Sequence, residues 1–503
     1  MEDFNDVCGK VENNFLDKNQ INSIVHNDDN QLIIAGAGSG KTTTIIGKIK
    51  YLVNKDLVKP NDILLLSFTN ASAKEMKARV QKEVGYEVNT YTFHKLGLEI
   101  VKKSLNEDIN IYSEGLSKVI IDNLLSLLKN KDYYNKFMEF LNNYIEIDYK
   151  NYYKFLFDVS GIFETIINLI KSNNYSLDDF KNICVKSKNN LIFDLIEPIY
   201  ENYNKFLVDN NLIDFNDMIN KAILYVSENK YIHNYKYVIV DEYQDISKAR
   251  FNLLKALREQ KFYKLFCVGD DWQSIYRFSG SDIGLITNFK KYWGNTYISK
   301  IENTYRFSDK LAKVSSKFVM KNPNQIRKCI KGYSSNVFPL SIIYGKDDRN
   351  CLNELEEKLK VLEYYSNVFF IGRYSFDIDI LKLNENFYIK YNKIEKCYEI
   401  IYSKRVDLNI KFLTVHKSKG LQADYVVVLN NKNGIMGFPS KVEDMKIINL
   451  LLDNSDNYPY SEERRLFYVS ITRSKKKTFL LVNLASKSIF IKEIEKMYLY
   501  KRL

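Results

Sequence analysis

The chain has 503 residues, of which 45% are hydrophobic and 27% charged, and its formal net charge is +12. This length predicts roughly two to four domains, and the composition excludes extended disorder. The longest apolar runs are far shorter than the roughly 20 residues of a membrane-spanning helix, which excludes a membrane contact of that kind. The positive charge suits a polyanionic partner, although many basic proteins have none.

The N-terminal residues, MEDFNDVCGK, are acidic and contain no signal-peptide core, which predicts a cytoplasmic protein. The six cysteines are scattered, with no CxxC pair and no histidine at metal-ligand spacing. We expect them to be free thiols in a reducing compartment.

The first half of the chain contains buried-type strands that end in polar residues or glycine and are separated by helical stretches. This pattern is typical of a parallel α/β sheet. The predicted strands are residues 31–36, 62–68, 235–241 and 264–270.

The first of these strands runs into AGAGSGKTTTI (35–45), the context that a phosphate-binding loop requires. Backbone N–H groups of such a loop surround the phosphates, Lys41 reaches the β and γ oxygens, and the Thr42 hydroxyl can bind Mg²⁺. The general pattern has glycine where this chain has Ala35. The predicted phosphate-loop residues are Ala35, Gly36, Ala37, Gly38, Ser39, Gly40, Lys41 and Thr42.

Between 106 and 211 the pattern changes to long amphipathic helices, with a tyrosine-rich patch at 148–157. Aromatic residues in such a patch can contact nucleic acid, but at helical spacing they more often form the core. We therefore expect mainly core aromatics here.

The next strand ends in VIVDEYQDIS (238–247). Asp241 is placed to hold Mg²⁺, and Glu242 to orient and deprotonate an attacking water. A strand-terminal pair of acids downstream of a phosphate loop predicts a nucleoside triphosphatase.

A further strand runs into VGDDWQSIYRFSG (268–280), which combines two aspartates, a glutamine and three aromatic residues. Such an abrupt change at the end of a strand indicates a site. The alternative is a buried phenylalanine with a capping glutamine. A second α/β region follows, with predicted strands at 367–373, 410–416, 423–430 and 478–483.

Taken in order, the motifs resemble those of superfamily 1 DNA helicases of the UvrD/Rep group, and within that group the helicase IV type. They span nearly the whole chain. The matching segments are LDKNQ (16–20), AGAGSGKT (35–42), LLLSFTNASAKEM (64–76), YTFHKLG (91–97), DEYQD (241–245), VGDDWQSIYRFSG (268–280), NTYRF (303–307), TVHKSKGLQADYV (414–426) and EERRLFYVSITRSK (462–475).

The resemblance implies ATP and Mg²⁺ as cofactors, bound between two motor domains. It assigns Gln20 to the adenine edge, Tyr305 to stacking on adenine, and Gln273 and Arg306 to the γ-phosphate. Arg473 looks like the arginine finger that stabilises charge in the transition state. Thr43 stands where several relatives have a base-stacking arginine, so the adenine contact is expected to be one-sided.

The resemblance also implies that single-stranded DNA runs across both motor domains. Aromatic rings suit this task because they stack on any base. The residues implied are Phe68, Asn70, His94, Tyr276, Phe278, Thr414 and His416, with a core role as the alternative for the two histidines. Phe278 stands where many relatives have tryptophan.

We therefore expect an α/β protein of two RecA-like P-loop NTPase domains. Only 110 positions separate Arg306 from His416, too few for the large accessory insertion that UvrD and Rep type relatives have there. Too few residues follow Arg473 for the nuclease domain of some relatives. The expected division is 1–105 and 212–285 for the first motor domain, 106–211 for its helical insertion, and 286–503 for the second motor domain.

The implied function is an ATP-dependent 3′→5′ DNA helicase that acts on single-stranded DNA and duplex junctions, with salt-dependent binding. Two alternatives remain open. One is a DNA-stimulated ATPase that serves as a sensor or motor subunit in a repair or defence complex, with a protein partner and little unwinding of its own. The other is an RNA-directed motor.

Overall fold

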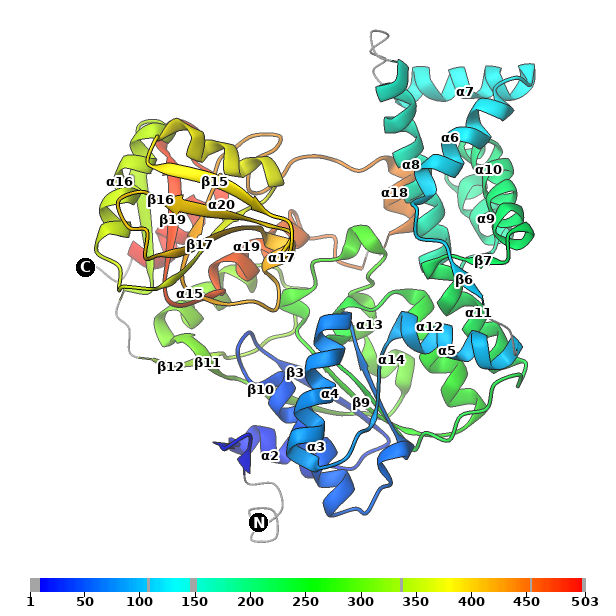
Figure 1. Cartoon of the computed structure of the whole chain (residues 1–503), viewed down its shortest axis with the longest axis horizontal. Helices are drawn as coiled ribbons and strands as arrows, with labels where there is room; N and C mark the ends of the chain where they lie inside the picture. Colours follow the sequence, from blue (N-terminus) through cyan, green and yellow to red (C-terminus); the bar gives the residue numbers. More distant parts are fainter. Residues whose placement is uncertain (1–9, 106–108, 145–151, 335–337, 453–454, 500–503) are drawn as a thin grey trace.

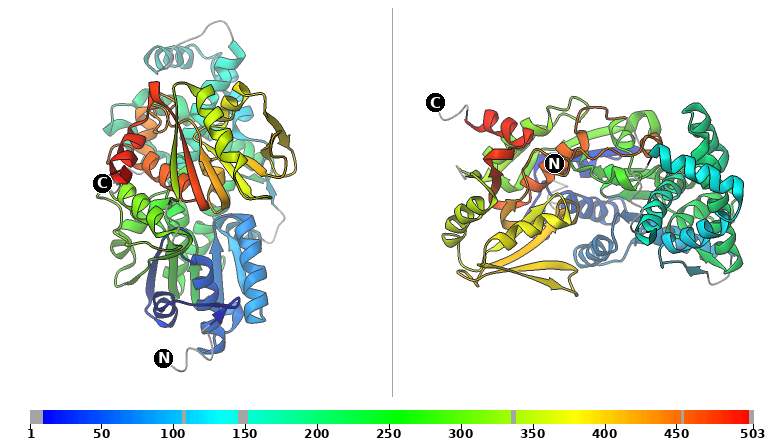
Figure 2. Two further views of the ribbon diagram at one scale, coloured as in Figure 1. Left: turned by 90° about the vertical axis from the view of Figure 1, so that its left-hand side faces the viewer. Right: turned by 90° about the horizontal axis from the view of Figure 1, so that it is seen from above.

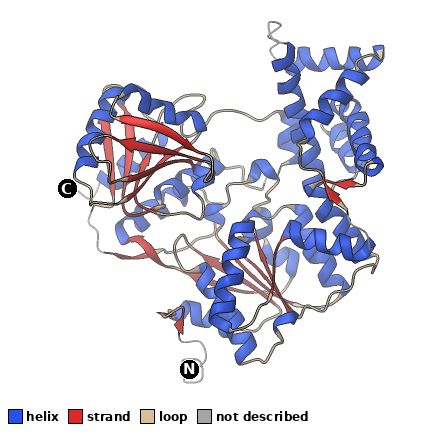
Figure 3. Ribbon diagram, viewed as in Figure 1, coloured by secondary structure: helices blue, strands red, loops and turns tan. Residues whose placement is uncertain are grey.

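The computed structural model describes residues 10–105, 109–144, 152–334, 338–452 and 455–499. Two sheets, each flanked by helices, lie side by side, and a separate group of helices stands at one end of the molecule (Figure 1, Figure 3). Seen from above, this group of helices lies to one side of the two sheets (Figure 2). The predicted α/β fold class, with two sheet domains, is confirmed.

The first sheet is wholly parallel, with strand order β10-β3-β9-β8-β4-β5. Its central strands are buried along their length because helices cover both faces, and the four predicted strands correspond to them. The strands are β3 (Asn30–Ala35), β4 (Ile63–Ser67), β5 (Asn89–Thr92), β8 (Tyr237–Val240), β9 (Lys264–Gly269) and β10 (Tyr297–Ile301). The larger helices of this domain are α3 (Lys41–Asn54), α4 (Asn70–Val84), α5 (Phe93–Leu105), α11 (Phe215–Ser227) and α12 (Lys248–Gln260).

Strand β10 changes the expected domain boundary at 285/286. It pairs in parallel with β3 from Tyr297 to Ile301, so the first domain's sheet extends to Ile301. The edge strands β5 and β10 were not predicted, because their side chains are only partly buried and their sequences contain no continuous apolar run.

The helical insertion has its own hydrophobic core. Its two ends meet where β6 (Asn110–Ile111) pairs with β7 (Leu212–Ile213). Of the tyrosine-rich patch, 148–151 lie outside the described residues; further on, Leu156 is buried and Phe157 is exposed. The helices are α6 (Leu116–Leu127), α7 (Lys131–Tyr144), α8 (Tyr152–Ser172), α9 (Leu177–Lys186) and α10 (Asn190–Asp209).

The second sheet is mixed, with strand order β13-β19-β18-β14-β17-β16-β15. The neighbours in the part β13-β19-β18-β14-β17 are parallel. Strand β16 is antiparallel to β17, and β15 is antiparallel to β16. The strands are β13 (Leu340–Gly345), β14 (Asn367–Gly372), β15 (Phe387–Asn392), β16 (Cys397–Tyr402), β17 (Asn409–Thr414), β18 (Ala423–Val428) and β19 (Ser474–Asn483), flanked by α15 (Asp309–Val319), α16 (Asp348–Lys360), α19 (Ser461–Ile471) and α20 (Ile489–Leu499). The described residues between Arg306 and His416 thus belong to this domain.

Two of the connections between the parts lie at Glu302 and at α18 (Lys446–Leu451). The chain passes from the first sheet to the second domain at Glu302, between β10 and β11 (Asn303–Ser308), and β11 pairs with β12 (Lys331–Ser334). Further on, α18 (Lys446–Leu451) leaves the second domain and packs beside α8 of the insertion (Figure 1). Asn173 of the insertion donates its amide to the Leu451 carbonyl at 2.8 Å.

No helix among the described residues is both long enough and apolar enough to span a membrane.

Candidate functional site

The predicted phosphate loop joins β3 to α3. Ala35 is the last residue of β3 and is fully buried, so the missing glycine falls in the strand and not in the loop. Within the loop, Gly38 and Gly40 have φ angles of 73° and 82°, a region that favours glycine. The N-terminus of α3, beginning at Lys41, faces the loop and favours an anion there.

Strand β11 of the second domain closes against this loop. The Tyr305 N–H donates to the Gly38 carbonyl at 3.0 Å, and the Thr304 hydroxyl to the Ala37 carbonyl at 2.7 Å. A Cβ atom at Gly38 would lie 2.5 Å from the Cβ of Arg306. Glycine at this position therefore allows the close approach that brings Arg306 to the loop.

The two acids that follow β8 lie opposite the loop. Lys41 Nζ is 3.0 Å from Glu242 Oε2, and Glu242 has a φ of 49°, a conformation that non-glycine residues rarely adopt. Burial raises the pKa of Asp241, and the neighbouring Glu242 raises it further. Although burial alone would raise the pKa of Glu242, the charges of Lys41 and Lys419 outweigh that effect and lower it. Glu242 is thus held ionised.

The environment of Asp241 fits a cation. Its Oδ1 atom is buried and has no hydrogen-bond partner among the described residues, and a carboxylate oxygen in that state is costly unless something binds it. Oxygen ligands are those that Mg²⁺ prefers, and Thr42 in the first turn of α3 adds a hydroxyl. The predicted metal residues thus fit Mg²⁺ at this place.

The residues predicted to contact the adenine lie at the edge of the same loop. The buried Gln20 donates its amide to the Ser39 carbonyl at 3.3 Å. Tyr305 is half exposed, and its hydroxyl donates to Asp17, the N-cap of the helix that carries Gln20. The ring of Tyr333 lies 6.0 Å from that of Tyr305 and was not predicted. Thr43 is partly buried in the first turn of α3.

Two arginines of the second domain enter the cleft without acidic partners. Arg473 is buried and bonds to the Val469 carbonyl and, at 3.1 Å, to the side-chain oxygen of Gln273. Arg306 bonds to the Gln422 amide oxygen and the Thr472 carbonyl. Across the described ranges, neither guanidinium has a carboxylate within 4.0 Å.

Electrostatics make these arginines a site for anions. Burial and, to a smaller extent, the charge of Arg306 lower the pKa of Arg473 to about 9. Two buried like charges that face each other are unfavourable unless a polyanion binds between them. The neutral amide of Gln422 leaves the Arg306 charge uncompensated.

Four of the residues predicted to contact DNA form one aromatic cluster on the other side of loop 270–280. The rings of Phe68 and Tyr276 stack at 5.3 Å, and the ring of Phe278 meets that of His416 edge to face at 5.2 Å. Tyr276 joins the two pairs, since it lies 6.2 Å from Phe278. Phe278 is 58% exposed, which argues against the alternative of a buried core residue.

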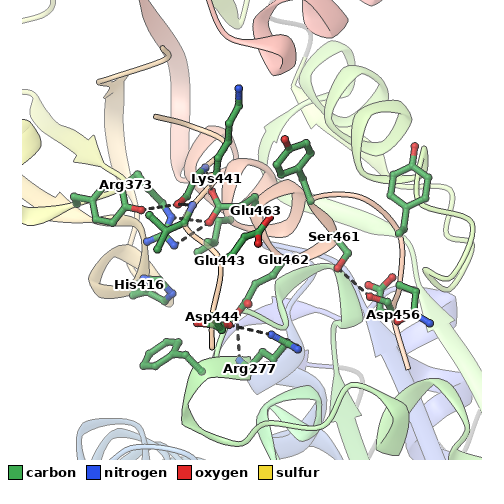
Figure 4. A pocket seen from close by; sticks show the side chains of 18 residues that line it. Arg277, Arg373, His416, Lys441, Glu443, Asp444, Asp456, Ser461, Glu462 and Glu463 are labelled. Carbon is green, nitrogen blue, oxygen red and sulfur yellow. Dashed lines mark hydrogen bonds and ion pairs between the residues drawn. The ribbon is translucent and has the colours of Figure 1, made fainter. Parts of the chain in front are cut away.

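A cavity of about 740 Å³ lies beside this cluster, and Figure 4 draws the side chains that line it. Arg277 and Arg373 lie on its wall, where they pair with Asp444 at 3.5 Å and Glu463 at 2.8 Å. Phe278 and His416 also line the cavity. The cavity lies between the first domain's loop and the second domain, and its lining carries basic side chains together with the acids Glu443, Asp444, Asp456, Glu462 and Glu463.

The other three predicted DNA contacts lie apart from the aromatic cluster. Asn70 begins α4 and accepts from Thr92, which directly precedes Phe93 and His94 at the start of α5. Thr414 ends β17, where its hydroxyl caps α17 (Val415–Ser418). Burial lowers the pKa of His94 to about 4, with the charge of Arg250 adding to the effect.

The His416 ring is also uncharged at neutral pH. Burial lowers its pKa to about 4, and the charge of Arg373 contributes. The cluster therefore offers neutral rings, and the cations of Arg250 and Lys419 lie over the rings of Phe68 and Tyr276.

A comparison with protein families matches residues 16–293 to the UvrD/REP helicase N-terminal domain. The chain belongs to the UvrD/REP helicase family.

Several helicases align with the chain over most of its length. It is 27% identical to DNA helicase IV of Escherichia coli, an alignment that covers 99% of the chain and 72% of that protein. It is 30% identical to the ATP-dependent DNA helicase Rep of Buchnera aphidicola, over 68% of the chain and 51% of Rep. The match to the ATP-dependent DNA helicase PcrA of Bacillus subtilis is 29%, over 63% of the chain. The chain thus spans about half of the Rep relative and more of the helicase IV relative.

Several side chains at the centre of this UvrD/REP site were not predicted. Lys419 forms an ion pair with Asp245 and donates to the Gln273 carbonyl at 2.7 Å. Gln244 donates to Glu242 and accepts from the Asp270 N–H, which joins the two acidic loops. Lys419 lies within the motif at 414–426, and its place in that motif was the one sequence feature from which its role could have been predicted.

Proposed function

We propose that this chain is an ATP-dependent motor that translocates 3′→5′ along single-stranded DNA and unwinds duplex DNA at junctions. The pair Arg306 and Arg473 carries the proposal. Within the part of the chain that the structure describes, neither guanidinium has a carboxylate partner; Arg306 lies next to Gly38 of the phosphate loop and Arg473 bonds to Gln273. This arrangement suits a triphosphate and its transition state. Family membership supports ATP as the nucleotide.

The nucleotide would lie between the phosphate loop and the arginines, with Gln20 and Tyr305 beside the base. Mg²⁺, held by Thr42 and Asp241, would supply charge neutralisation at the phosphates. Glu242 is ionised beside Lys41 and is the group to orient and deprotonate the attacking water. Arg306 and Arg473 stabilise charge that develops on the γ-phosphate.

Single-stranded DNA would cross the aromatic cluster, with bases stacked on Phe278 and neighbouring rings. The loop 270–280 carries Gln273 on the nucleotide side and Phe278 on the DNA side. One rigid loop with both residues gives a direct route from phosphate sensing to base contact. Repeated opening and closing of the cleft would advance the strand.

The first test is Lys41→Ala. Loss of the ammonium group removes a contact to the transferred phosphate, so DNA-stimulated ATPase activity should fall by about 10²–10³-fold. Affinity for single-stranded DNA without nucleotide should change little, because Lys41 lies on the other side of the loop.

The matched control is Lys50→Ala on the same helix. Lys50 Nζ lies 2.7 Å from Glu83 Oε1, and this ion pair is away from the phosphate loop. It should retain wild-type turnover. Equal ATPase rates for Lys41→Ala and the wild type would refute the proposal.

A further inference from the structure

Trp272 lies in the loop that follows β9 of the first sheet, yet its side chain is buried in the second domain. Its ring is fully buried and meets the ring of Tyr468 edge to face at 5.5 Å. Its indole N–H donates to the carbonyl of Ile326 at 3.0 Å. The residue next to Gln273 is therefore held by the second domain.

Lys328 completes this attachment. Its side chain is fully buried, and its ammonium group pairs with Asp270 and, at 2.7 Å, with Asp271. The same ammonium lies 4.3 Å from the centre of the Trp272 ring. The Ile326 N–H donates to the second oxygen of Asp271 at 2.8 Å. The segment 326–328 thus contacts three consecutive residues of the loop.

The contacts continue from Lys328 to Gln273. One oxygen of Asp270 binds Lys328 and the other accepts from the Gln273 amide nitrogen. The amide oxygen of Gln273 then faces Arg473. Because the carboxylate is fixed by Lys328, it determines which end of the Gln273 amide points toward the arginine.

The start of the loop remains joined to the first domain, since the Asp270 N–H donates to Gln244 at 2.8 Å. Backbone and side chains of the loop are therefore held from opposite sides of the cleft. A relative movement of the two domains must act on this loop.

We propose that Lys328 is a positioning residue for ATP hydrolysis, which together with Trp272 ties residues 270–273 to the second domain and sets the amide of Gln273. The inference rests on the proposed function, in which Gln273 senses the γ-phosphate. It adds that the sensor is oriented from the second domain, although its loop follows a strand of the first sheet.

The test uses Lys328→Met, which keeps the length of the side chain and removes its charge. Disorientation of Gln273 affects the transition state more than nucleotide binding. DNA-stimulated kcat should therefore fall about tenfold while the KM for ATP changes less than about twofold. Lys328→Arg, which keeps the positive charge, should retain most of the wild-type kcat. The double variant Lys328→Met with Asp271→Asn restores the balance of buried charge, so it should recover the stability lost in Lys328→Met but not the kcat.

Lys171→Met is the matched control. Lys171 is also a buried lysine between two carboxylates, Asp214 at 2.6 Å and Asp217 at 3.0 Å, but it lies in the helical insertion. Both variants should lower Tm, because each leaves buried carboxylates unpaired. Only Lys328→Met should change kcat.

Fluorescence provides a readout that is independent of ATPase activity. The chain has two tryptophans, so a Trp293→Phe background leaves Trp272 as the sole indole. Lys328→Met should move its emission to longer wavelength and increase its quenching by acrylamide, whereas Lys171→Met should not. Equal kcat and equal emission for the two variants would overturn the inference. Failure of the proposed function would appear instead as a Lys41→Ala variant with wild-type turnover.

Discussion

At the scale of single residues, Phe278 is the most exposed of the clustered rings that lie near the cavity. An exposed ring that neighbours other rings is a stacking surface, and each stacked base contributes roughly 1–3 kcal/mol. Phe278→Ala should weaken single-strand affinity by about that amount and reduce DNA stimulation of the ATPase, with basal nucleotide binding unchanged. Fluorescence anisotropy with a labelled oligonucleotide would measure the loss.

Phe262→Ala is a suitable control for that experiment. Phe262 is 57% exposed, almost the same as Phe278, but it precedes β9, whereas the loop with Phe278 follows that strand. Its loss should leave DNA affinity unchanged. If Phe278→Ala only lowers Tm and binds DNA normally, the ring has a packing role.

Some of the site residues can be recognised from the sequence, and others only from the structure. Lys41, Asp241 and Glu242 follow strands in motifs whose spacing reflects the chemistry, so the sequence indicates them directly. Lys328 lies in no such motif, and its role depends on contacts with Asp270 and Asp271 across more than 50 positions of chain. An isolated lysine is usually solvated, so its burial was not predictable from local pattern.

At the scale of elements, α18 is the helix whose position the sequence did not predict. Ile447 and Leu451 are buried in the core of the helical insertion, although the chain reaches them from the second domain. The helix has six residues and too few turns to show a clear apolar period, and its partner α8 lies almost 300 positions earlier. Edge strands β5 and β10 were not predicted for a related reason. Each forms a strand because it pairs with a neighbouring strand, and its own sequence shows no strong strand pattern.

Replacement of Leu451 by alanine should loosen this contact. Removal of a buried leucine side chain lowers stability by about 2–5 kcal/mol, and here the interaction that is weakened is the packing of α18 against α8. Hydrogen exchange should therefore accelerate in α18 and in the facing part of α8, with the two sheets unaffected.

Leu450→Ala is the control, because Leu450 is 42% exposed on the same helix. It should leave exchange unchanged. Similar acceleration in both variants would indicate that α18 is not held by its buried face.

At the scale of the whole molecule, direction of movement separates the proposed motor from the alternatives. A 3′→5′ motor loads on a 3′ single-stranded tail, so it should displace the strand of a 3′-tailed DNA duplex and leave 5′-tailed and blunt duplexes intact. Displacement should weaken as salt rises, because phosphate contacts release counterions. Lys41→Ala provides the inactive control.

The other outcomes of this assay are equally informative. DNA-stimulated ATPase activity without displacement would favour a sensor or a subunit of a larger complex. Displacement of RNA duplexes in preference to DNA would favour an RNA-directed motor. Displacement from the 5′ tail alone would contradict the proposed direction.

Two of the connections between the parts of the molecule have a mechanical consequence. One is the covalent passage at Glu302, and the other is the contact of α18 with α8. If the contacts across the cleft change while these two are kept, the second domain can turn about the line through the two places, but it resists sliding and free rotation. We therefore expect a single angle to describe how far the second domain stands from the first. A probe on each domain should report one continuous coordinate through the cycle, and release of α18 should add a second degree of freedom.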